Sequence, residues 1–526
     1  MTTLQKYNCM DAIATFQLYQ EFKPLLAKHS YARRAYAERK ALNAPALYAM
    51  LRGILVDQEA VSVLREQFTN ECKQLEWALD KITRPLRLGC INFASSTQVI
   101  WLLECLGATV PKSRNWKSKG TKSADRETLE QIARGDIVLA PVCNIVLAWR
   151  DRAKMLTILR PTLTDRDGRM RCFYKVAGTK TTRWSSGMNS WADKRKKLSS
   201  GMNMQNIKRD EDEQLAGHAS IRSAFVADSE RKFANIDLER ADSYGVALEV
   251  FKATGDKKYL EACQSRDLHT FTSMLMWPNL PWKGSPHNIT DDDIAIAKTF
   301  FYRQYDHRFM SKKLNHGAPY MGKPRTLAIQ MKIPLAVCER GFKGFFGEFP
   351  AIRKWHTIRA RHLQTKGYLI NVHGTRRNFH SRLDDDATLR AAIGWLGQSS
   401  TAGSINKSVL RLFAVQLQMP EEELEFLAQV HDSALEQYPE VREAEAIDLI
   451  RHVMPVPITV TSPQGETITV AIPLEVSVGW NWASHSIANP DGLIKLKPGQ
   501  IDDRKRERLP KTKAFRLMDR RLSSFY

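Results

Sequence analysis

The sequence predicts a multi-lobed protein of the α+β class, because helix-prone and strand-prone stretches alternate along a long chain. The 526 residues are 43% apolar and 9% aromatic, which is enough to build several domains around large cores. Helix-prone sequence fills residues 11–40, 45–159 and 251–365. Short strands and turns mix in 166–250, and between 386 and 482 helix gives way to strands, including a β-branched hairpin at 458–470.

Two breaks in this pattern predict boundaries. The helix-prone residues 11–40 end in a basic cluster, and the Pro45 that follows predicts that the helix stops there. After Trp482 the periodicity is lost, and the basic stretch 504–521 predicts a partly ordered tail.

The charge balance points to a polyanionic partner. The chain has 79 Lys and Arg against 57 Asp and Glu, a formal net charge of +22, and neutralising phosphates would release counterions. A basic insertion that contains a tryptophan, 112–120, suits phosphate contact, with a solvated loop as the alternative, and 187–197 is another basic and aromatic insertion. No apolar stretch approaches the ~18 residues that span a membrane. We therefore expect a soluble, cytoplasmic protein that binds nucleic acid and no membrane.

The eight cysteines are scattered, with no Cys-x-x-Cys pair and no histidine at zinc-finger spacing. A structural zinc site is therefore not expected. We expect buried, reduced thiols, since a cytoplasmic setting disfavours disulfides.

Two aspartates at the ends of strand-like runs are the candidate catalytic groups. Asp237 ends the run 233–236, and Asp432 lies between the apolar run 424–428 and the turn-like residues 436–439, where a hairpin tip is expected. In a basic protein, two strand-borne carboxylates indicate divalent metal ions that act on phosphate esters. A turn or helix-cap carboxylate is the alternative for each aspartate alone.

A helix expected from about residue 295 to 316 places Arg308, Lys312 and His316 at successive i, i+4 positions, with Tyr320 one step further on. Such a stripe could grip a triphosphate, because Arg offers a fork of donors and Lys a mobile charge. A solvated basic helix face is the alternative. Pro319 disfavours helix just before it, so we expect the helix to end or kink near residue 317 and Tyr320 to leave the stripe.

Together, these segments resemble the motifs of family A DNA polymerases, the DNA polymerase I family. Residues 308–320 resemble motif B, whose pattern is Arg-x3-Lys-x3-aromatic-Gly-x2-Tyr-Gly, while 236–242 resemble motif A and 430–432 resemble motif C. Further matching elements lie at 92–98, 149–154, 181–186, 204–207, 221–225, 267–269, 374–377, 390–393 and 398–400. The similarity runs from about residue 7 to 482, and its specificity lies in the number of matches found in one order.

The resemblance implies a right-hand polymerase fold, with an antiparallel-sheet palm and largely helical thumb and fingers. It divides the chain into a remnant of the C-terminal part of a 3′–5′ exonuclease domain (1–43), the thumb (44–165), the first part of the palm with motif A (166–250), the fingers with motif B (251–385), the second part of the palm with motif C (386–485) and a basic C-terminal tail (486–526).

The implied activity is template-directed extension of a primer with dNTPs, so primer-template DNA and dNTPs are the implied partners. By resemblance, Asp237 and Asp432 would hold two Mg²⁺ ions, with the backbone carbonyl of Leu238 as a third ligand and Mn²⁺ as an alternative ion. Arg308 would bind the β- and γ-phosphates. Lys312 would bind the α-phosphate and act as the general acid for pyrophosphate.

The same resemblance assigns the remaining nucleotide and DNA contacts. His269 would add a further triphosphate contact, His316 takes the aromatic position of motif B, and Tyr320 would lie under the templating pair. The residues expected to contact DNA are Arg183, Gln398, Arg390, His431 and Asn206. Arg183 and Gln398 would reach the minor groove, where every correct pair shows an acceptor in the same place, so we expect shape to be checked without sequence being read.

Four positions depart from the family's pattern. Asp242, at the sugar gate, is one methylene shorter than the usual glutamate, which predicts a weaker or differently supported barrier against a ribose 2′-OH. His316 stands where Phe or Tyr is usual, which affects the expected discrimination against dideoxynucleotides. Ser433 follows motif C where glutamate is common, and Met321 replaces a glycine. None of these changes removes a metal ligand.

Tyr7 and Asp11 resemble the last motif of the family's 3′–5′ proofreading exonuclease. Only six residues precede Tyr7, so we expect the earlier exonuclease motifs to be absent and this chain not to proofread. Two interpretations stay open: the start of a surface helix, or a split gene whose separately encoded product supplies the exonuclease.

The leading prediction is a DNA polymerase of bacteriophage type. A single-subunit RNA polymerase is one alternative, and the acidic Asp242 argues against it because such an enzyme needs room for the 2′-OH. A catalytically inactive DNA-binding replication subunit is the other. Retention of Asp237, Asp432, Arg308 and Lys312 argues against that alternative.

Overall fold

The computed structural model describes residues 2–112, 120–188, 201–207, 220–302, 305–331, 333–420 and 423–504. Most of the two basic insertions expected at 112–120 and 187–197, and all but the first residue of the basic stretch 504–521, lie outside the described residues.

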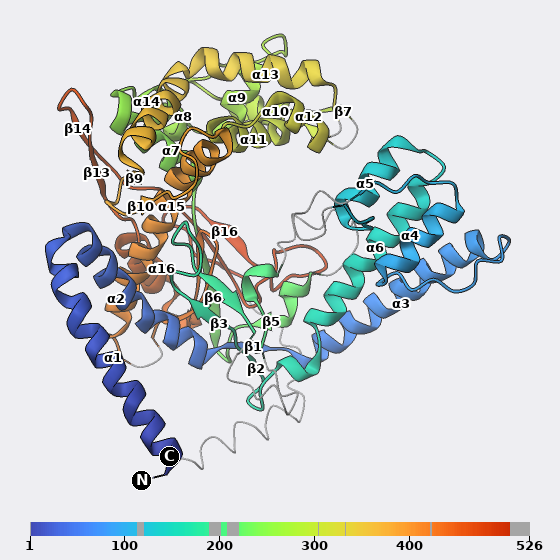
Figure 1. The fold of residues 1–526 in the computed structure, drawn as a ribbon, viewed down its shortest axis with the longest axis horizontal. Helices are drawn as coiled ribbons and strands as arrows, with labels where there is room; N and C mark the ends of the chain where they lie inside the picture. Colours follow the sequence, from blue (N-terminus) through green and yellow to red (C-terminus); the bar gives the residue numbers. More distant parts are fainter. Residues whose placement is uncertain are drawn as a thin grey trace.

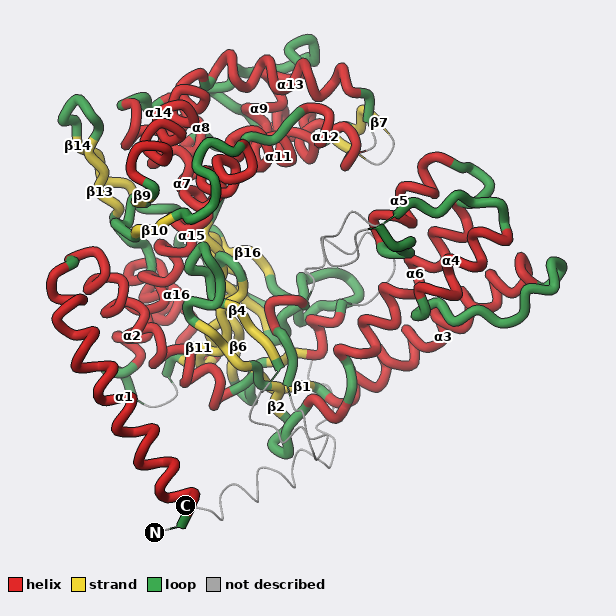
Figure 2. Tube along the Cα trace, viewed as in Figure 1, coloured by secondary structure: helices red, strands yellow, loops and turns green. Residues whose placement is uncertain are grey.

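A five-stranded antiparallel sheet forms the centre of the molecule, with helices gathered around it (Figures 1 and 2). Its strand order is β11-β12-β6-β15-β16. The strands span Glu425–Val430 (β11), Ser433–Pro439 (β12), Arg231–Leu238 (β6), Leu474–Gly479 (β15) and Ile494–Leu496 (β16). Every residue of β11 is buried, which is the pattern of a strand covered on both faces.

The sheet corrects two expectations. Residues 436–439 are not a turn, because they pair with β6 as the second half of β12. The C-terminal tail expected from residue 486 contains β16, which pairs with β15 at the edge of the sheet. Asp502 then accepts a hydrogen bond from the buried Lys232 at 3.1 Å.

Helices α15 (Asp386–Gln416) and α16 (Glu443–Val453) pack beside this sheet, and α7 (Ala241–Thr254), which follows β6, packs on α15. Helices α7 and α15 approach closely, because a Cβ at Gly245 of α7 would lie 3.0 Å from the carbonyl oxygen of Gly397 in α15. This contact fixes the start of α7, just after β6, against the middle of α15.

Helix α2 (Ser30–Arg52) runs straight through Pro45, so the expected break there does not occur. Pro45 is buried together with Leu42, Ala46 and Ala49, and Arg52 at the helix end donates to Glu425 of β11 at 2.6 Å. Burial and this ion pair outweigh the cost of an interior proline. The division of the chain into domains stays a prediction.

Four helices form a separate lobe beside the sheet, on the right in Figure 1. They are α3 (Gln58–Thr83), α4 (Ser96–Cys105), α5 (Arg126–Gly135) and α6 (Ala140–Ile158). Asp57, Ser95 and Asp125 cap the first three of these helices. The lobe has its own apolar core around Val99, Leu102 and Val146.

A second helical lobe lies above the sheet, at the top of Figure 1. It contains α8 (Lys258–Gln264), α9 (Leu268–Met276), α10 (Asp291–Ala297), α11 (His307–Gly317), α12 (Pro324–Met331), α13 (Leu335–Glu348) and α14 (Pro350–Lys366). The helix expected from residue 295 begins only at His307. Strands β7 (Phe300–Tyr302) and β8 (Tyr305–Asp306) intervene, and Asp306 caps α11 by accepting from the Phe309 amide at 2.6 Å.

The remaining elements are short, apart from the N-terminal helix. They are α1 (Thr3–Lys28), β1 (Ile54–Val56), β2 (Arg169–Met170), β3 (Phe173–Lys175), β4 (Ser185–Gly187), β5 (Phe225–Val226), β9 (Tyr368–Ile370), β10 (Arg376–Asn378), β13 (Ile458–Thr461) and β14 (Thr467–Val470). Pairing of β13 with β14 confirms the hairpin predicted at 458–470.

All eight cysteines are free thiols, but Cys9, Cys90 and Cys105 are exposed rather than buried as expected. Among the described residues, no helix is both long and apolar enough to cross a membrane.

Candidate active site

Asp237 and Asp432 come together at one end of the sheet. Asp237 is the penultimate residue of β6 and pairs with Ser433, the first residue of β12. Asp432 immediately precedes Ser433, and its carbonyl oxygen accepts a hydrogen bond from the Leu238 amide at 3.2 Å. The predicted meeting of the two aspartates on neighbouring strands is therefore present, across almost two hundred residues of sequence.

A two-residue turn holds Asp432 in place. Val430 of β11 pairs directly with Ser433 of β12, so only His431 and Asp432 connect the strands. His431 has a φ of 59°, the left-handed conformation that a tight hairpin of this length requires. The Ser433 hydroxyl donates to the Val430 carbonyl at 2.8 Å and closes the turn. Ser433, at the position where glutamate is common in the motif that this segment resembles, thus stabilises the turn.

The donors gathered here fit a hard divalent cation. They are the carboxylates of Asp237 and Asp432 and the carbonyl of Leu238, all oxygen ligands of the kind that Mg²⁺ and Mn²⁺ prefer. Within the described ranges, no cluster of three or more His, Cys, Asp or Glu residues forms a metal site built from protein side chains alone. Two carboxylates instead leave coordination positions for substrate phosphates and water, as Mg²⁺ sites on phosphate substrates do.

Glu475 is a neighbour that the sequence did not reveal. It pairs with Asp237 from the other side, on β15, so that Asp237 lies between Ser433 and Glu475 in the sheet. Its carboxylate accepts a hydrogen bond from Lys495 of β16 at 2.8 Å. The alternation of residues in β15 could have indicated the face of the strand on which Glu475 lies. Its pairing with Asp237 could not be predicted, because that pairing depends on the order of the strands in the sheet.

Arg308 lies at the start of α11 and forms a bidentate ion pair with Asp267. Its Nε and Nη2 donate to the two carboxylate oxygens at 2.7 and 3.0 Å. Burial would raise the pKa of Asp267, but the hydrogen bonds and charge of Arg308 outweigh it and lower the pKa to about 2. Asp267 also accepts from the His269 and Thr270 amides as the N-cap of α9, the one role that its sequence position signals.

His269 lies near the start of α9, among charged groups of both signs. Burial lowers its pKa to about 3, and the positive charges of Arg308 and Lys312 act in the same direction against the opposing effect of Asp267. Asn315 of α11 donates to His269 Nδ1 at 3.1 Å. His269 is therefore oriented by Asn315, beside the guanidinium of Arg308.

The structure confirms the helical stripe of Arg308, Lys312 and His316, since all three lie in α11. His316 lies within electrostatic range of Asp242 in α7 and of Asp432 in the β11–β12 turn, so this end of α11 is close to the turn that carries Asp432. The helix ends at Gly317, and Tyr320 follows in the 3-10 turn Ala318–Tyr320, as Pro319 predicted.

Asp242, the residue at the expected sugar gate, accepts two hydrogen bonds at its Oδ1. The Arg183 guanidinium donates to it at 3.2 Å and the Thr401 hydroxyl of α15 donates at 2.9 Å. Asp242 lies in the first turn of α7, which starts from a left-handed Arg240 with a φ of 54°. Arg183, expected to contact DNA, and Asp242, expected to contact the nucleotide, therefore belong to one cluster. Thr401 was not predicted.

Tyr320 packs directly on Gly397 of α15. A Cβ at Gly397 would lie 2.4 Å from the tyrosine hydroxyl, so only glycine fits there. The hydroxyl is buried and has no hydrogen-bond partner in the described part of the chain. Gln398 is the next residue of α15 and is half-buried, which brings a residue expected at the minor groove beside one expected under the templating pair.

Asn206 and Arg390 are two further residues expected to contact DNA. Asn206 is exposed at the end of the 3-10 turn Met204–Asn206, and its neighbour Gln205 donates to the Gln429 side chain at 3.1 Å, next to the His431 turn. Arg390 forms an ion pair with Asp386 near the start of α15.

Tyr7 and Asp11 are on α1, which projects from the molecule in Figure 1 and has no buried residue. They are not part of this centre, and the structure gives no contact that would distinguish the two interpretations of them.

Comparison with known proteins places this geometry in a family. The family model described as DNA polymerase family A matches residues 58–484. The chain is 24% identical over 483 residues to "DNA polymerase I, thermostable" of Thermus filiformis, covering 90% of this chain and 50% of that protein. It is likewise 24% identical over 498 residues to "DNA polymerase I" of Rhizobium leguminosarum, covering 90% of this chain and 43% of that protein. The chain thus spans about half the length, or less, of these curated relatives.

A solved structure agrees in fold. The POL domain of Pol1 from M. smegmatis, in complex with DNA primer-template and dNTP, superposes with a TM-score of 0.64 at 20% identity, over 84% of this chain and 69% of that one. The α+β fold is the right-hand polymerase fold, with an antiparallel-sheet palm and largely helical thumb and fingers. With the family model matching most of its length, the chain belongs to DNA polymerase family A.

Proposed function

We propose that this chain is a template-directed DNA polymerase that extends a primer 3′ end with dNTPs. The observation that carries the proposal is the pairing of Asp237 with Ser433, which sets Asp237 and Asp432 side by side at the end of the sheet. The formal net charge of +22 and the stripe of Arg308 and Lys312 supply the charge that a DNA and triphosphate substrate requires.

Asp237, Asp432 and the carbonyl of Leu238 would hold two Mg²⁺ ions. When bound, the two metal ions would lower the pKa of the attacking 3′ hydroxyl and stabilise the pyrophosphate leaving group. Arg308 and Lys312 orient the triphosphate from one face of α11, and Lys312 holds a proton for the leaving pyrophosphate. His269 adds a hydrogen bond to the same group.

Asp242 is fixed by Arg183 and Thr401, so it presents a carboxylate of set position to the sugar of the incoming nucleotide. His316 and Tyr320 flank the base. Arg183 and Gln398 reach acceptors in the minor groove, which are alike for every correct pair, so pair shape rather than sequence is tested. Asn206, Arg390 and His431 contact the DNA around this point.

Lack of proofreading by this chain, with the exonuclease on a separate polypeptide, is the second part of the proposal. The support is α1, which has no buried residue and exposes large apolar side chains such as Leu4, Tyr7, Phe16 and Phe22. A partner that covers this helix would bury them. Purified chain should leave a 3′-mismatched primer intact, and excision of the mismatch would contradict the proposal. A role in bacteriophage replication stays a prediction.

Primer extension tests the main proposal. On a primed template with Mg²⁺, the chain should add the nucleotide complementary to each template base, with dNTPs preferred to rNTPs. A preference for rNTPs would indicate an RNA polymerase instead. DNA binding without any extension would indicate an inactive replication subunit.

A further inference from the structure

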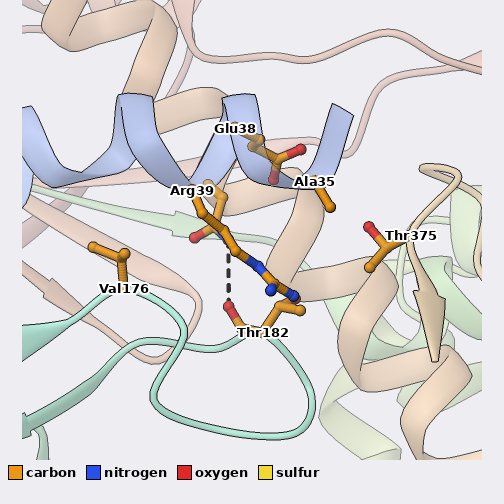
Figure 3. Close-up of a pocket in the computed structure, with 7 residues that line it drawn as sticks. Ala35, Glu38, Arg39, Val176, Thr182 and Thr375 are labelled. Atoms are coloured by element: carbon orange, nitrogen blue, oxygen red, sulfur yellow. Dashed lines mark hydrogen bonds between the residues drawn. The ribbon is translucent and has the colours of Figure 1, made fainter. Parts of the chain in front are cut away.

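A basic pocket lies outside the proposed active centre, between α2, the loop 177–182, β10 and α15. Its volume is about 260 Å³, and it adjoins a smaller pocket with which it shares Arg39, Thr182 and Thr375. Figure 3 shows the smaller pocket, with Arg39 extending from α2 toward Thr182 of the loop. We call the two together the α2–β10 pocket.

Four cations line the larger part of this pocket: Arg39, Lys180, Arg376 and Arg377. Within the residues that the structure describes, no ion pair is formed by any of them. Arg376 stacks on the Tyr368 ring at 3.7 Å, and Arg377 lies over the Phe379 ring at 4.5 Å, so aromatic contacts hold both guanidiniums without neutralising them. The acidic Glu38 lines only the smaller part. The pocket is therefore built for an anion.

Trp395 of α15 completes the wall of the larger part. It is 1% exposed, and its indole Nε1–H is buried with no acceptor among the described residues. The unpaired cations of the wall are matched by a ligand with negative charge, and a phosphate group supplies that charge.

The pocket is connected to the active centre through two short segments. Thr182 in its wall is followed by Arg183, which bonds Asp242, and Trp395 lies three residues before Gln398 on α15. On the other side it opens onto α2, where Arg33, Arg34 and Lys40 carry further positive charge. Arg34 packs over Gly374, with its guanidinium 3.6 Å from where a Cβ would stand. This line of charge suits a strand better than a single small anion.

The helical lobe α3–α6 lies on the opposite side of the central sheet from α2 in Figure 1. If duplex product occupies the side of α3–α6, template that has not yet been copied must reach the active centre from another direction. The α2 side offers a cationic path, and a cavity of about 260 Å³ has room for one nucleotide-sized group but not for a duplex.

We propose that the α2–β10 pocket binds a phosphodiester group of the single-stranded template ahead of the templating base. The proposal rests on the proposed polymerase function and adds a binding site whose N-terminal contributor, Arg39, lies outside the residues matched by the family model. The pocket would hold the uncopied strand through charge and hydrogen bonds to phosphate, independently of sequence.

Binding of the full chain to two primer-templates tests this site. Both have the same duplex, but one has a 1-nucleotide and the other a 12-nucleotide 5′ template overhang. The unmodified chain should bind the longer overhang roughly ten-fold tighter, and Arg39→Gln/Lys180→Gln should lose most of that preference. The salt dependence of long-overhang binding should also become shallower, by about 0.7 in log–log slope for each phosphate that the variant no longer neutralises.

A charge-matched control makes the result specific. Lys354→Gln/Arg361→Gln removes the same charge from exposed positions of α14 and should keep the overhang preference. An equal reduction of the preference in the pocket variant and the α14 control would overturn the proposal, as would an unchanged preference in Arg39→Gln/Lys180→Gln.

Single-nucleotide incorporation on the short-overhang primer-template shows whether the pocket binds a phosphate of the template strand or a phosphate of the incoming dNTP. The pocket variant should keep the dNTP KM, whereas a raised KM there would assign the pocket to a nucleotide and overturn the template proposal. The binding assay needs no catalysis. A chain that binds primer-template but never extends the primer would contradict the polymerase proposal, and its overhang preference would still test the α2–β10 pocket.

Discussion

Asp267 and Arg308 form a bidentate ion pair that joins the start of α9 to the start of α11. The carboxylate accepts from Nε and Nη2 and so fixes the plane of a guanidinium that we propose binds the triphosphate. Asp267 is itself held by the Thr270 hydroxyl at 2.5 Å and by its capping contacts. We infer that Asp267 is a positioning residue for Arg308.

Asp267→Asn should raise the dNTP KM roughly ten-fold, because a neutral amide holds the guanidinium less firmly than a carboxylate does. Steady-state incorporation on a primed template measures the change, with DNA affinity as the second readout. Asp291→Asn is the matched control, since Asp291 forms an exposed ion pair with Arg266 nearby. A lower KM would mean instead that Asp267 competes with the triphosphate for Arg308.

Asp242→Ala should weaken discrimination against ribonucleotides about ten-fold or more, because it removes the group that Arg183 and Thr401 hold at the proposed sugar gate. The ratio of kcat/KM for dNTP and rNTP measures this effect. Thr401→Val keeps Asp242 but deletes its 2.9 Å hydrogen bond and should give a smaller change in the same direction. If both variants keep the ratio of the unmodified chain, Asp242 is not the sugar gate.

His431→Gly should stabilise the β11–β12 hairpin by about 1 kcal/mol, because glycine adopts a positive φ without the steric penalty of a side chain. Amide hydrogen exchange in β12 reports the local stability. His431→Ala also removes the ring but keeps a Cβ at that φ, so it should show no such gain. Slower exchange in both variants would trace the effect to the ring rather than to the backbone.

His373 should make stability fall as pH drops below about 6.5. Burial lowers its pKa to about 3, with Lys407 acting in the same direction, and its Nε2 lies 2.9 Å from the Ser400 carbonyl. Between these pKa values the unfolded chain binds a proton that the folded chain does not, so stability is full above about pH 6.5 and is lost toward pH 3, at up to about 1.4 kcal/mol per pH unit.

Thermal unfolding midpoints across this pH range, compared between the unmodified chain and His373→Gln, measure that contribution. The variant should show a flatter decline. His452→Gln, at an exposed position of α16, should leave the decline as it is. A decline of equal steepness in His373→Gln would show that His373 is not the source.

Local sequence patterns predicted those parts of the site that depend on neighbouring residues. The i, i+4 spacing of Arg308 and Lys312, the end of α11 before Pro319 and the hairpin at 458–470 are all consequences of local backbone chemistry. Asp237 was predicted beside Asp432 because two carboxylates at strand ends in a basic protein indicated a shared metal site. The resemblance to motifs A and C supported the same pairing.

The remaining features depend on tertiary contacts that no local pattern encodes. Helix α2 passes through Pro45 because Arg52, seven residues later, meets Glu425 across the fold. The pairs Arg183–Asp242 and Arg308–Asp267 each join residues dozens of positions apart. Strand β16 was expected to be tail because three residues carry too little periodicity to be recognised without their partner strand.

The central claim is that Asp237 and Asp432 together hold the catalytic metal ions. Single-turnover incorporation of one dNTP, with Mg²⁺ and primer-template already bound, tests it most directly. Asp432→Asn should slow incorporation by about a thousand-fold or more and leave DNA affinity nearly unchanged. Asp448→Asn, at an exposed position of α16, should behave like the unmodified chain. Incorporation by Asp432→Asn at the rate of the unmodified chain would contradict the account.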